Sequence, residues 1–328
     1  MRQIAFELER GGAPTYRVRA FRRAAQVVGD LAPGELERRL KAGTLEALPG
    51  IGATTAQVIA EAAAGQQPGY LTRLLSEQPA TEHDAMRDAL RGDCHTHSDW
   101  SDGGSPPLEM AEAARALGHE WIALTDHSPR LTVANGLSAS RLEAQLELIE
   151  ALNAELAPFR ILTGIEVDIL EDGSLDQRED LLDRLDVVVA SVHSQLRMPA
   201  GPMTRRMVAA IRNPHVDVLG HCTGRLLGGG RGRRPESVFD PVAVFGACQQ
   251  HGVAVEINCR PERMDPPDRL LGLAAEAGCR FAIDTDAHAP GQLDWLGNGT
   301  VRAEKFGIAP ERVINTRGAD EVIGGGRA

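Results

Sequence analysis

The segment with the most specific chemistry is residues 93–102, which read DCHTHSDWSD. His95 and His97 are two residues apart, so on an extended strand both imidazoles point to the same side. That spacing suits a pair of metal ligands, and Asp102 follows in a turn rich in Ser, Asp and Gly. A lone H-x-H motif is not specific, because a polar strand end also produces it.

Five later segments repeat one pattern, an apolar run that ends in His, Asp or Glu. Their polar ends are Asp126 with His127, Glu166, His193, His221, and Asp286 with His288. Continuous apolar runs are typical of parallel strands that are buried on both faces. Six of the ten histidines lie at such strand ends, which random placement does not produce. The pattern predicts a multinuclear metal site.

Alternating strands and helices account for residues 92–300, as seven β-α units. Ligand types that gather at the C-terminal ends of parallel strands are typical of an α/β barrel, whose reactive face is built there. The other histidines of this region, His119, His215 and His251, fall at strand beginnings or helix ends. They belong to the opposite face, and a structural role is expected for them.

The composition is that of an ordinary globular protein, with 42% hydrophobic and 25% charged residues. Residues 1–90 carry as many basic as acidic side chains, so the remainder holds the whole net charge of −11. The five cysteines form no C-x-x-C pair, and buried free thiols are expected. No signal peptide opens the chain and no apolar run approaches the roughly 18 residues of a membrane span. A cytoplasmic protein without membrane contact is therefore expected.

Residues 1–75 are predicted to form a small all-α domain. A Gly-Ile-Gly turn at residues 50–52 joins two predicted helices, residues 34–42 and 53–64. Backbone N–H groups at such a turn can bind a phosphate oxygen without reading the bases. The arginines of an earlier predicted helix, which begins near Thr15, are open to two interpretations, a solvated face or phosphate contact. The expected DNA contacts are Arg19, Arg22, Arg23, Gly50, Ile51 and Gly52.

This hairpin resembles a helix-hairpin-helix, and residues 16–25, YRVRAFRRAA, are similar to the N-terminal domain of family X DNA polymerases. The resemblance implies non-specific DNA binding. The lyase activity of that domain needs Schiff-base lysines in the helix after the hairpin, where this chain has Thr54 and Val58. Lyase activity is therefore not expected. Residues 76–91, which include His83, are predicted to be a linker.

Residues 92–310 resemble the polymerase-and-histidinol-phosphatase (PHP) domain. The motifs are H-x-H…D, T-D-H, G-x-E, S-x-H, G-H and D-x-D-x-H, in that order. The resemblance implies a distorted (β/α)7 barrel over a domain of residues 92–328. The variant with Asp102 is similar to the PHP domain at the C-terminus of bacterial family X polymerases, although Cys222 replaces the usual Pro after His221. Because the linker leads directly from the hairpin domain to this domain, no polymerase activity is expected.

By this resemblance, nine residues bind three divalent metal ions. The first ion is assigned His95, His97, Glu166 and Asp286, the second shares Glu166 and adds His193 and His221, and the third is assigned Asp102, His127 and His288. Such a site suits Zn²⁺, Mn²⁺ or Fe²⁺, and ligand type alone does not select among them. The resemblance favours Mn²⁺ for nuclease activity.

The residues expected to act in catalysis are Glu166, His193, Asp286, Arg225 and Arg263. Arg225 lies in a glycine-rich loop that continues to Arg234, interpreted either as a phosphate contact or as a solvent-exposed loop. Arg260 and Arg263, after the sixth strand, are a second expected phosphate contact. The carboxylates expected to orient the ligating imidazoles are Asp93, Asp126 and Asp284.

Three functions are consistent with these features. The first is a metal-dependent phosphodiesterase that acts on DNA ends, a 3′→5′ exonuclease or end-processing enzyme in repair. The second is a phosphomonoesterase for a small metabolite, of the histidinol-phosphatase type. The third is a non-catalytic DNA-binding protein, which the presence of all nine ligand types disfavours.

Overall fold

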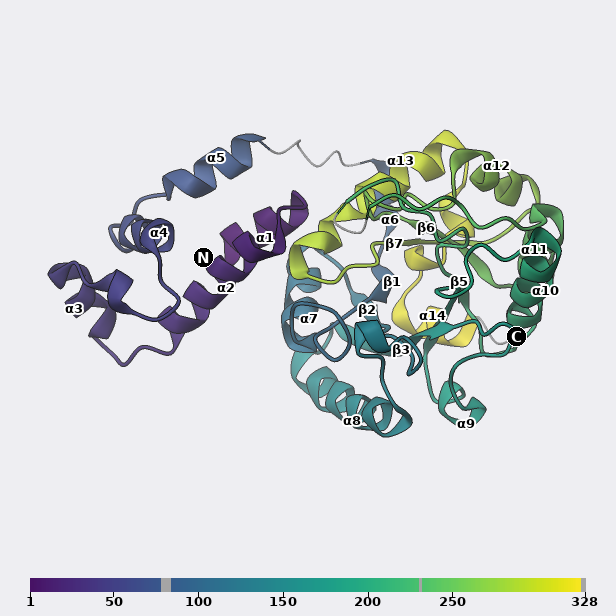
Figure 1. Cartoon of the computed structure of the whole chain (residues 1–328), viewed down its shortest axis with the longest axis horizontal. Coiled ribbons are helices and arrows are strands. Elements are labelled where there is room, and N and C mark those ends of the chain that lie inside the picture. The colour runs from purple at the N-terminus through teal and green to yellow at the C-terminus, as the bar shows by residue number, and fades with distance from the viewer. Residues whose placement is uncertain (78–83, 230–231, 326–328) are drawn as a thin grey trace. The chain divides into compact units, whose positions relative to one another are not determined.

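The computed structural model describes residues 1–77, 84–229 and 232–325 (Figure 1). The chain forms two compact units, residues 1–81 and 82–328. His83 and Arg231, which the sequence placed in the linker and in the glycine-rich loop, lie outside the described residues. No helix within the described ranges combines the length and the apolar character that crossing a bilayer requires.

The first unit is entirely helical where it is described. Its helices are α1 (Arg2–Arg10), α2 (Thr15–Gly29), α3 (Glu35–Ala42), the 3-10 turn η1 (Leu45–Ala47), α4 (Ala53–Ala63) and α5 (Gly69–Glu77). Apolar residues at helical spacing face inward, as Ile4 and Leu8 of α1 and Phe21 of α2 illustrate. The small helical domain expected from the sequence is present, and its hairpin lies between η1 and α4.

The second unit is built on a sheet of seven parallel strands in sequential order. The strands are β1 (Gly92–Thr96), β2 (Trp121–Leu124), β3 (Arg160–Asp168), β4 (Val187–Ser191), β5 (Val218–Leu219), β6 (Ala254–Asn258) and β7 (Phe281–Asp284). A parallel bridge between Thr96 and Ala287 brings the first and last strands together. The (β/α)7 barrel expected from the sequence is therefore confirmed.

Helices cover the outside of this barrel (Figure 1). They are α6 (Ala85–Ala89), α7 (Pro107–Ala116), α8 (Ala139–Leu156), α9 (Glu179–Leu182), α10 (Ala200–Ile211), α11 (Pro241–His251), α12 (Asp268–Glu276) and α13 (Gly297–Lys305). Helix α14 (Ala319–Gly325) instead packs against the apolar cluster of the barrel interior, through Ala319, Val322 and Ile323. Short 3-10 segments are η2 (Thr132–Ala134), η3 (Pro290–Leu296), η4 (Pro310–Arg312) and η5 (Ile314–Thr316). Helix α6 begins inside the segment predicted as linker, and Asp84 caps it and accepts a hydrogen bond from Thr300 Oγ1 at 2.7 Å.

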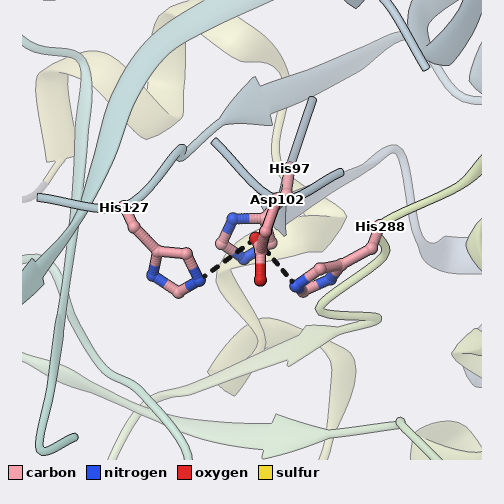
Figure 2. A group of neighbouring side chains, drawn as sticks. All are labelled: His97, Asp102, His127 and His288. Atoms are coloured by element: carbon pink, nitrogen blue, oxygen red, sulfur yellow. Dashed lines mark ion pairs between the residues drawn. The ribbon is translucent and has the colours of Figure 1, made fainter. Parts of the chain in front are cut away.

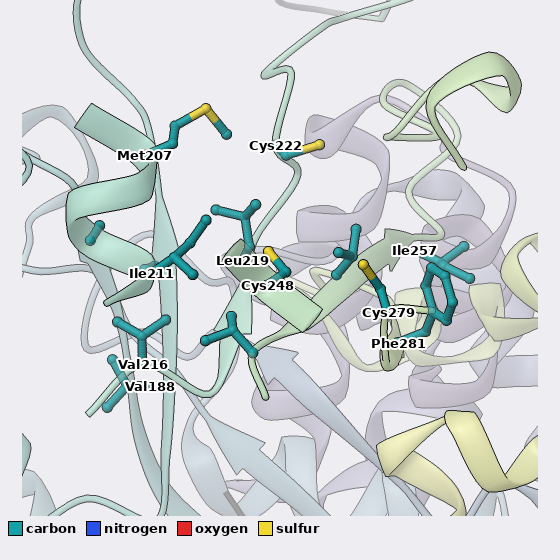
Figure 3. Packing of buried hydrophobic residues seen from close by; sticks show 14 of the residues in the cluster. Val188, Met207, Ile211, Val216, Leu219, Cys222, Cys248, Ile257, Cys279 and Phe281 are labelled. Atoms are coloured by element: carbon teal, nitrogen blue, oxygen red, sulfur yellow. The ribbon is translucent and has the colours of Figure 1, made fainter. Parts of the chain in front are cut away.

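Alternation along the strands separates two apolar layers. Val187 and Val189 of β4 face the barrel interior together with Val218 and Ala254, whereas Val188 packs outward in the layer between strands and helices. Figure 3 shows this outer layer around Met207, Ile211, Leu219 and Phe281. All five cysteines are free and buried, and burial raises the pKa of each thiol. They are packing residues, as the sequence predicted.

His119 lies just before β2, on the opposite side of the barrel from the carboxyl ends of the strands. Its side chain is buried, and neither ring nitrogen has a hydrogen-bond partner within the described residues. Burial, reinforced by the charge of Arg87, lowers the pKa of His119 from 6.5 to about 3. The unfolded chain therefore binds this proton more tightly than the folded chain between those two pH values, and folding stability falls as the pH drops through that window.

We expect His119→Leu to remove this acid sensitivity. Between pH 7.5 and 4.5, the metal-free variant should lose about 2–3 kcal/mol less unfolding free energy than the natural protein. Urea unfolding of chelator-treated protein at both pH values measures the difference. His251→Leu, at the exposed end of α11, provides the control. Equal pH dependence in the natural protein and His119→Leu would contradict the prediction.

Candidate metal centre

The carboxyl ends of the strands meet around Glu166, which is fully buried near the end of β3. Its Oε2 atom lies 2.8 Å from His127 Nδ1, 3.4 Å from His95 Nε2 and 3.6 Å from His97 Nε2. Its Oε1 atom lies 2.8 Å from His221 Nε2 and 3.3 Å from His193 Nε2. One carboxylate thus contacts five imidazoles that come from four segments of the sequence.

On the β5 side, the close approach of the Gly220 backbone to side chains of β4 permits this convergence. Gly220 precedes His221, and a Cβ atom at this position would lie only 2.3 Å from Ser191 Oγ at the end of β4. The same Cβ atom would lie 2.8 Å from Val189 Cγ1, so a larger residue here would require β4 side chains or β5 to shift. The G-H motif therefore has a steric basis.

Asp102 gathers the imidazoles on the side nearest β1 and β7. Figure 2 shows its carboxylate facing His127 and His288, with distances from Asp102 Oδ1 of 3.4 Å to His127 Nε2 and 3.3 Å to His288 Nε2. His97, Asp102, His127 and His288 each offer an atom within 4.8 Å of the others, as a metal site requires. This is the group expected for the third ion, with His97 added.

Asp286 is the anionic residue of a second group, with His95 and His97, and a third group consists of His127, Glu166 and His193. The Asp286 Oδ1 atom lies 3.5 Å from His97 Nε2, and its Oδ2 atom lies 3.0 Å from Arg263 Nε. Asp286 has a φ of 53°, a left-handed conformation that non-glycine residues rarely adopt. The surrounding contacts hold this strained backbone, which turns the carboxylate back over the barrel.

The buried charges at the centre shift one another's protonation. Burial opposes the ionised form of Glu166, but the charges of His193, His95 and His127 lower its pKa well below the ordinary value. Burial likewise opposes ionisation of Asp286, and Arg263 and Arg260 lower its pKa. Burial and the neighbouring His288 and His127 lower the pKa of His97, which keeps its ring neutral. Ionised carboxylates and a neutral imidazole are the forms that bind metal. Against the effect of burial, Glu166 raises the pKa of His95, and raises that of His193 to about 9, so these two rings hold a proton that a metal ion would displace.

Several of these buried atoms have no hydrogen-bond partner within the described chain. They are His95 Nε2, His97 Nδ1 and Nε2, His127 Nδ1, Glu166 Oε2, His193 Nε2 and His221 Nδ1. Buried polar atoms are otherwise almost always paired. Their number, their convergence and their chemistry fit divalent cations with a preference for imidazole and carboxylate.

Two carboxylates that hold imidazoles were missed in the sequence. Asp168, at the end of β3, contacts His193 Nδ1, and Glu256 of β6 lies 2.6 Å from His95 Nδ1. Glu256 stands within an apolar strand and not at its end, where ligands were sought. Asp168 is two residues after Glu166, so period-two alternation would have placed both on one face.

The three carboxylates expected to orient imidazoles hold backbone and hydroxyl groups instead. Asp93 accepts hydrogen bonds from the His95 N–H at 3.0 Å and from Thr285 Oγ1 at 2.5 Å. Asp126 accepts bonds from Ser98, Ser101 and Gln145 and so fixes the loop that carries Asp102. Asp284 accepts bonds from the Cys94 N–H and the Asn315 side chain. These three carboxylates therefore position the ligands by holding the backbone and side chains near them, and not by hydrogen bonds to the imidazole rings.

Arg225, predicted to bind the substrate, is engaged within the fold. Its Nε donates to the Arg263 carbonyl at 2.9 Å and its Nη2 donates to the Met264 carbonyl. Arg234 likewise donates through Nε to the Gly224 carbonyl at 2.6 Å. The bonds of Arg225 tie the loop after β5 to the loop after β6, whereas the Arg234 bond lies within the loop after β5, so the geometry favours a structural role for Arg225. Arg263 differs, because its Nη1 has no hydrogen-bond partner within the described chain although the residue is 5% exposed.

The helical unit places the expected DNA contacts unequally. Arg19 and Arg23 are exposed on one face of α2, and Arg23 lies against Gly50, whose added Cβ would be 2.8 Å from Arg23 Cγ. Arg22 instead forms an ion pair of 2.6 Å with the buried Glu9. These contacts divide the predicted arginines into an exposed pair and one structural residue.

The hairpin N–H groups at residues 51 and 52 are also engaged within the fold. Ile51 N–H donates to the Leu48 carbonyl and Gly52 N–H donates to Thr55 Oγ1. The donors left at this helix start are therefore the first N–H groups of α4, because those groups have no acceptor within a helix.

The comparisons with known proteins agree with this geometry. Residues 93–259 match the PHP domain and residues 1–67 match a helix-hairpin-helix domain. The fold and the matches define a metal-dependent phosphoesterase on a seven-stranded α/β barrel. The chain belongs to the PHP family, which confirms the resemblance drawn from its motifs. Only residues 68–92 separate the two matched domains, so no polymerase domain lies between them.

Two related proteins differ in how much of their own length the match covers. The chain is 42% identical over 233 residues to the DNA polymerase/3′-5′ exonuclease PolX of Bacillus subtilis, covering 71% of this chain but only 40% of PolX. It is 30% identical over 236 residues to a probable phosphatase of Thermoanaerobacter sp., covering 68% of this chain and 89% of that protein.

A solved structure supports the fold assignment. Histidinol phosphate phosphatase from Lactococcus lactis, complexed with zinc, L-histidinol and phosphate, matches with a TM-score of 0.50 at 20% identity. The match covers 67% of this chain and 95% of that protein. At this identity the likeness shows the shared fold alone.

Proposed function

We propose that this protein is a metal-dependent phosphodiesterase that removes nucleotides from 3′ ends of DNA during repair. The observation that carries the proposal is the convergence of five histidines on the buried Glu166, in a chain that also has a helix-hairpin-helix unit. The likeness to PolX supports DNA as the substrate, and Asp102 supports the same subgroup. A cytoplasmic location belongs to this proposal.

Nine residues would hold three divalent ions, either Mn²⁺, Zn²⁺ or Fe²⁺. When bound, such ions lower the pKa of water and stabilise negative charge on a phosphate ester. Glu166 would join two of the positions, because its two oxygens face different imidazoles. Asp286 and His193 would complete these positions, and Asp102 with His127 and His288 would form the third.

Arg263 is the side chain assigned to the phosphate. It is buried next to Asp286, and its Nη1 is available as a donor within the described chain. A guanidinium in such a place donates charge-assisted hydrogen bonds to phosphate oxygens and strengthens them by excluding water. Its ion pair with Asp286 fixes the guanidinium before substrate binds.

The helical unit would hold DNA through its backbone phosphates. We expect Arg23→Ala to reduce the slope of log affinity against log salt by roughly 1, since one phosphate contact is lost. Fluorescence anisotropy of a labelled duplex over a range of salt concentrations measures this slope. Arg38→Ala, which removes an exposed arginine of α3, should leave the slope unchanged. Equal slopes for both variants would contradict the assignment of Arg23 to DNA.

The experiment that tests the proposed function is cleavage of 3′-labelled and 5′-labelled oligonucleotides, single- and double-stranded, with Mn²⁺. Mononucleotide released at once from the 3′-labelled strand, with a progressively shortened 5′-labelled strand, is the expected result. Intact oligonucleotides would overturn the proposal. The same preparations are assayed with histidinol phosphate.

A second candidate function is a phosphomonoesterase for a small metabolite. It is favoured by the 30% identity with a probable phosphatase that aligns over most of its own length. Phosphate release from histidinol phosphate together with intact oligonucleotides would establish this alternative. Binding of DNA without hydrolysis of either substrate would indicate a non-catalytic DNA-binding protein.

A further inference from the structure

Strand β6 differs from the other strands of the barrel in its relation to the centre. Each of the other six strands, or the loop that follows it, carries at least one of the nine residues expected to bind metal. Strand β6 carries none of them. Its inner face nevertheless presents Glu256 and Asn258, two residues apart and both fully buried. A buried carboxylate and amide are unfavourable unless they form specific hydrogen bonds.

Glu256 uses both carboxylate oxygens on ligand residues. Its Oε1 accepts from His95 Nδ1 at 2.6 Å, and its Oε2 accepts from the His221 backbone N–H at 2.5 Å. Asn258 Nδ2 then donates to Glu256 Oε2 and to Asp286 Oδ2, both at 3.2 Å. The pair therefore contacts residues supplied by β1 and by the chain after β5 and β7.

These bonds determine which ring nitrogen of His95 can bind a metal. A carboxylate only accepts, so in the metal-binding form of the ring the proton must lie on Nδ1. The lone pair then lies on Nε2, the atom 3.4 Å from Glu166 Oε2. The bond to the His221 N–H fixes the backbone of that ligand, whose Nε2 faces the other oxygen of Glu166.

We propose that Glu256 and Asn258 are positioning residues that orient His95, His221 and Asp286 together, so that one ligand-free strand aligns two neighbouring metal positions. The proposal rests on the proposed metal-dependent function. Asp168 orients a single ligand, because among the nine residues expected to bind metal it contacts only the ring of His193. Loss of Glu256 should therefore affect more than one metal position, whereas loss of Asp168 should affect one.

Glu256→Gln tests this without removing bulk. A carboxamide has one oxygen and one NH₂ group, so it cannot accept from both His95 and His221. If the NH₂ group faces His95, the ring must accept at Nδ1, which moves the proton to Nε2. If it faces His221, two donors oppose each other. Either orientation disturbs one ligand, while the shape of the buried side chain is kept.

Metal binding is measured by titrating chelator-treated protein with Zn²⁺ against a fluorescent competitor, with metal content from mass spectrometry. Spectra of Co²⁺-substituted protein report the coordination geometry. We expect affinity at the positions of His95 and His221 to fall about 10–100-fold in Glu256→Gln, with altered Co²⁺ spectra. Asp168→Asn should weaken a single position, and the exposed Glu276→Gln should change nothing.

Urea unfolding of the metal-free proteins separates orientation from simple stability. Metal affinity and Co²⁺ spectra equal to those of the natural protein, with a lower urea midpoint, would overturn the proposal and indicate a structural role. Such a result would leave the proposed function intact. A natural protein that binds no divalent ion would overturn both.

Discussion

Replacement of Glu166 by Gln is expected to lower phosphoester hydrolysis by about 10³-fold or more, equivalent to about 4 kcal/mol of transition-state stabilisation. The reason is geometric, because both oxygens of this carboxylate face imidazoles that it must share with metal ions. A carboxamide removes the negative charge and turns an NH₂ group toward one set of rings. Initial rates on a 5′-labelled oligonucleotide with Mn²⁺ measure the change.

The control for this variant is Glu171→Gln, an exposed acidic residue in the loop after β3. It should hydrolyse DNA at the natural rate. Both variants should bind duplex DNA normally, since the helical unit is unchanged in them. A Glu166→Gln protein that retains a tenth or more of the natural rate would exclude Glu166 as the shared residue of the centre.

Ligand-type residues were predictable because their signal is local. Glu166, His193 and His221 each end an apolar run, and parallel strands bring their carboxyl ends to one face. Glu256 lacks this signal, since it lies inside its strand. Its role depends on a contact with His95, which is 161 residues away in sequence. A charged residue within a buried strand does, however, indicate that a hydrogen-bond or ion-pair partner exists.

Arg225 has partners that the local pattern does not show. In the sequence, an arginine in a glycine-rich loop beside a metal site suggests a phosphate contact. In the structure, its guanidinium hydrogen-bonds carbonyl groups from a loop 38 residues further along the chain. Arg22 also has a partner that the local pattern does not show, because Glu9 lies on the preceding helix. Spacing reveals which residues share an element, whereas the partners of long side chains depend on tertiary packing.

The fold was predictable at the level of elements and their order. Apolar strands alternating with helices predicted a parallel sheet, and the ligand types at the C-terminal ends of the strands favoured a barrel. The ties between neighbouring loops were not predictable, and Asp265 is the main example. This fully buried residue after β6 accepts hydrogen bonds from Thr223 Oγ1 at 2.6 Å, from the Thr223 N–H at 3.1 Å and from the Arg225 N–H at 3.3 Å.

Asp265→Ala is expected to lower the unfolding free energy of the metal-free protein by about 3–5 kcal/mol. Three donors after β5 would lose their common acceptor in a buried place, and each unpaired group costs about 1–3 kcal/mol before the loop relaxes. Urea unfolding followed by circular dichroism measures the change. Asp180→Ala, which removes an exposed ion pair with Arg178, should leave the urea midpoint unchanged.

The same variant separates two views of the loop that carries Arg225. If Asp265 anchors that loop to the one after β6, its loss should also weaken metal binding, because His221 lies only two residues before the anchored Thr223. If the loop after β5 were an independent, solvent-exposed segment, Asp265→Ala would leave both the urea midpoint and the metal affinity at natural values. Asp265→Asn should lie between these cases, since an amide oxygen can still accept from Thr223 but its NH₂ group opposes a second donor.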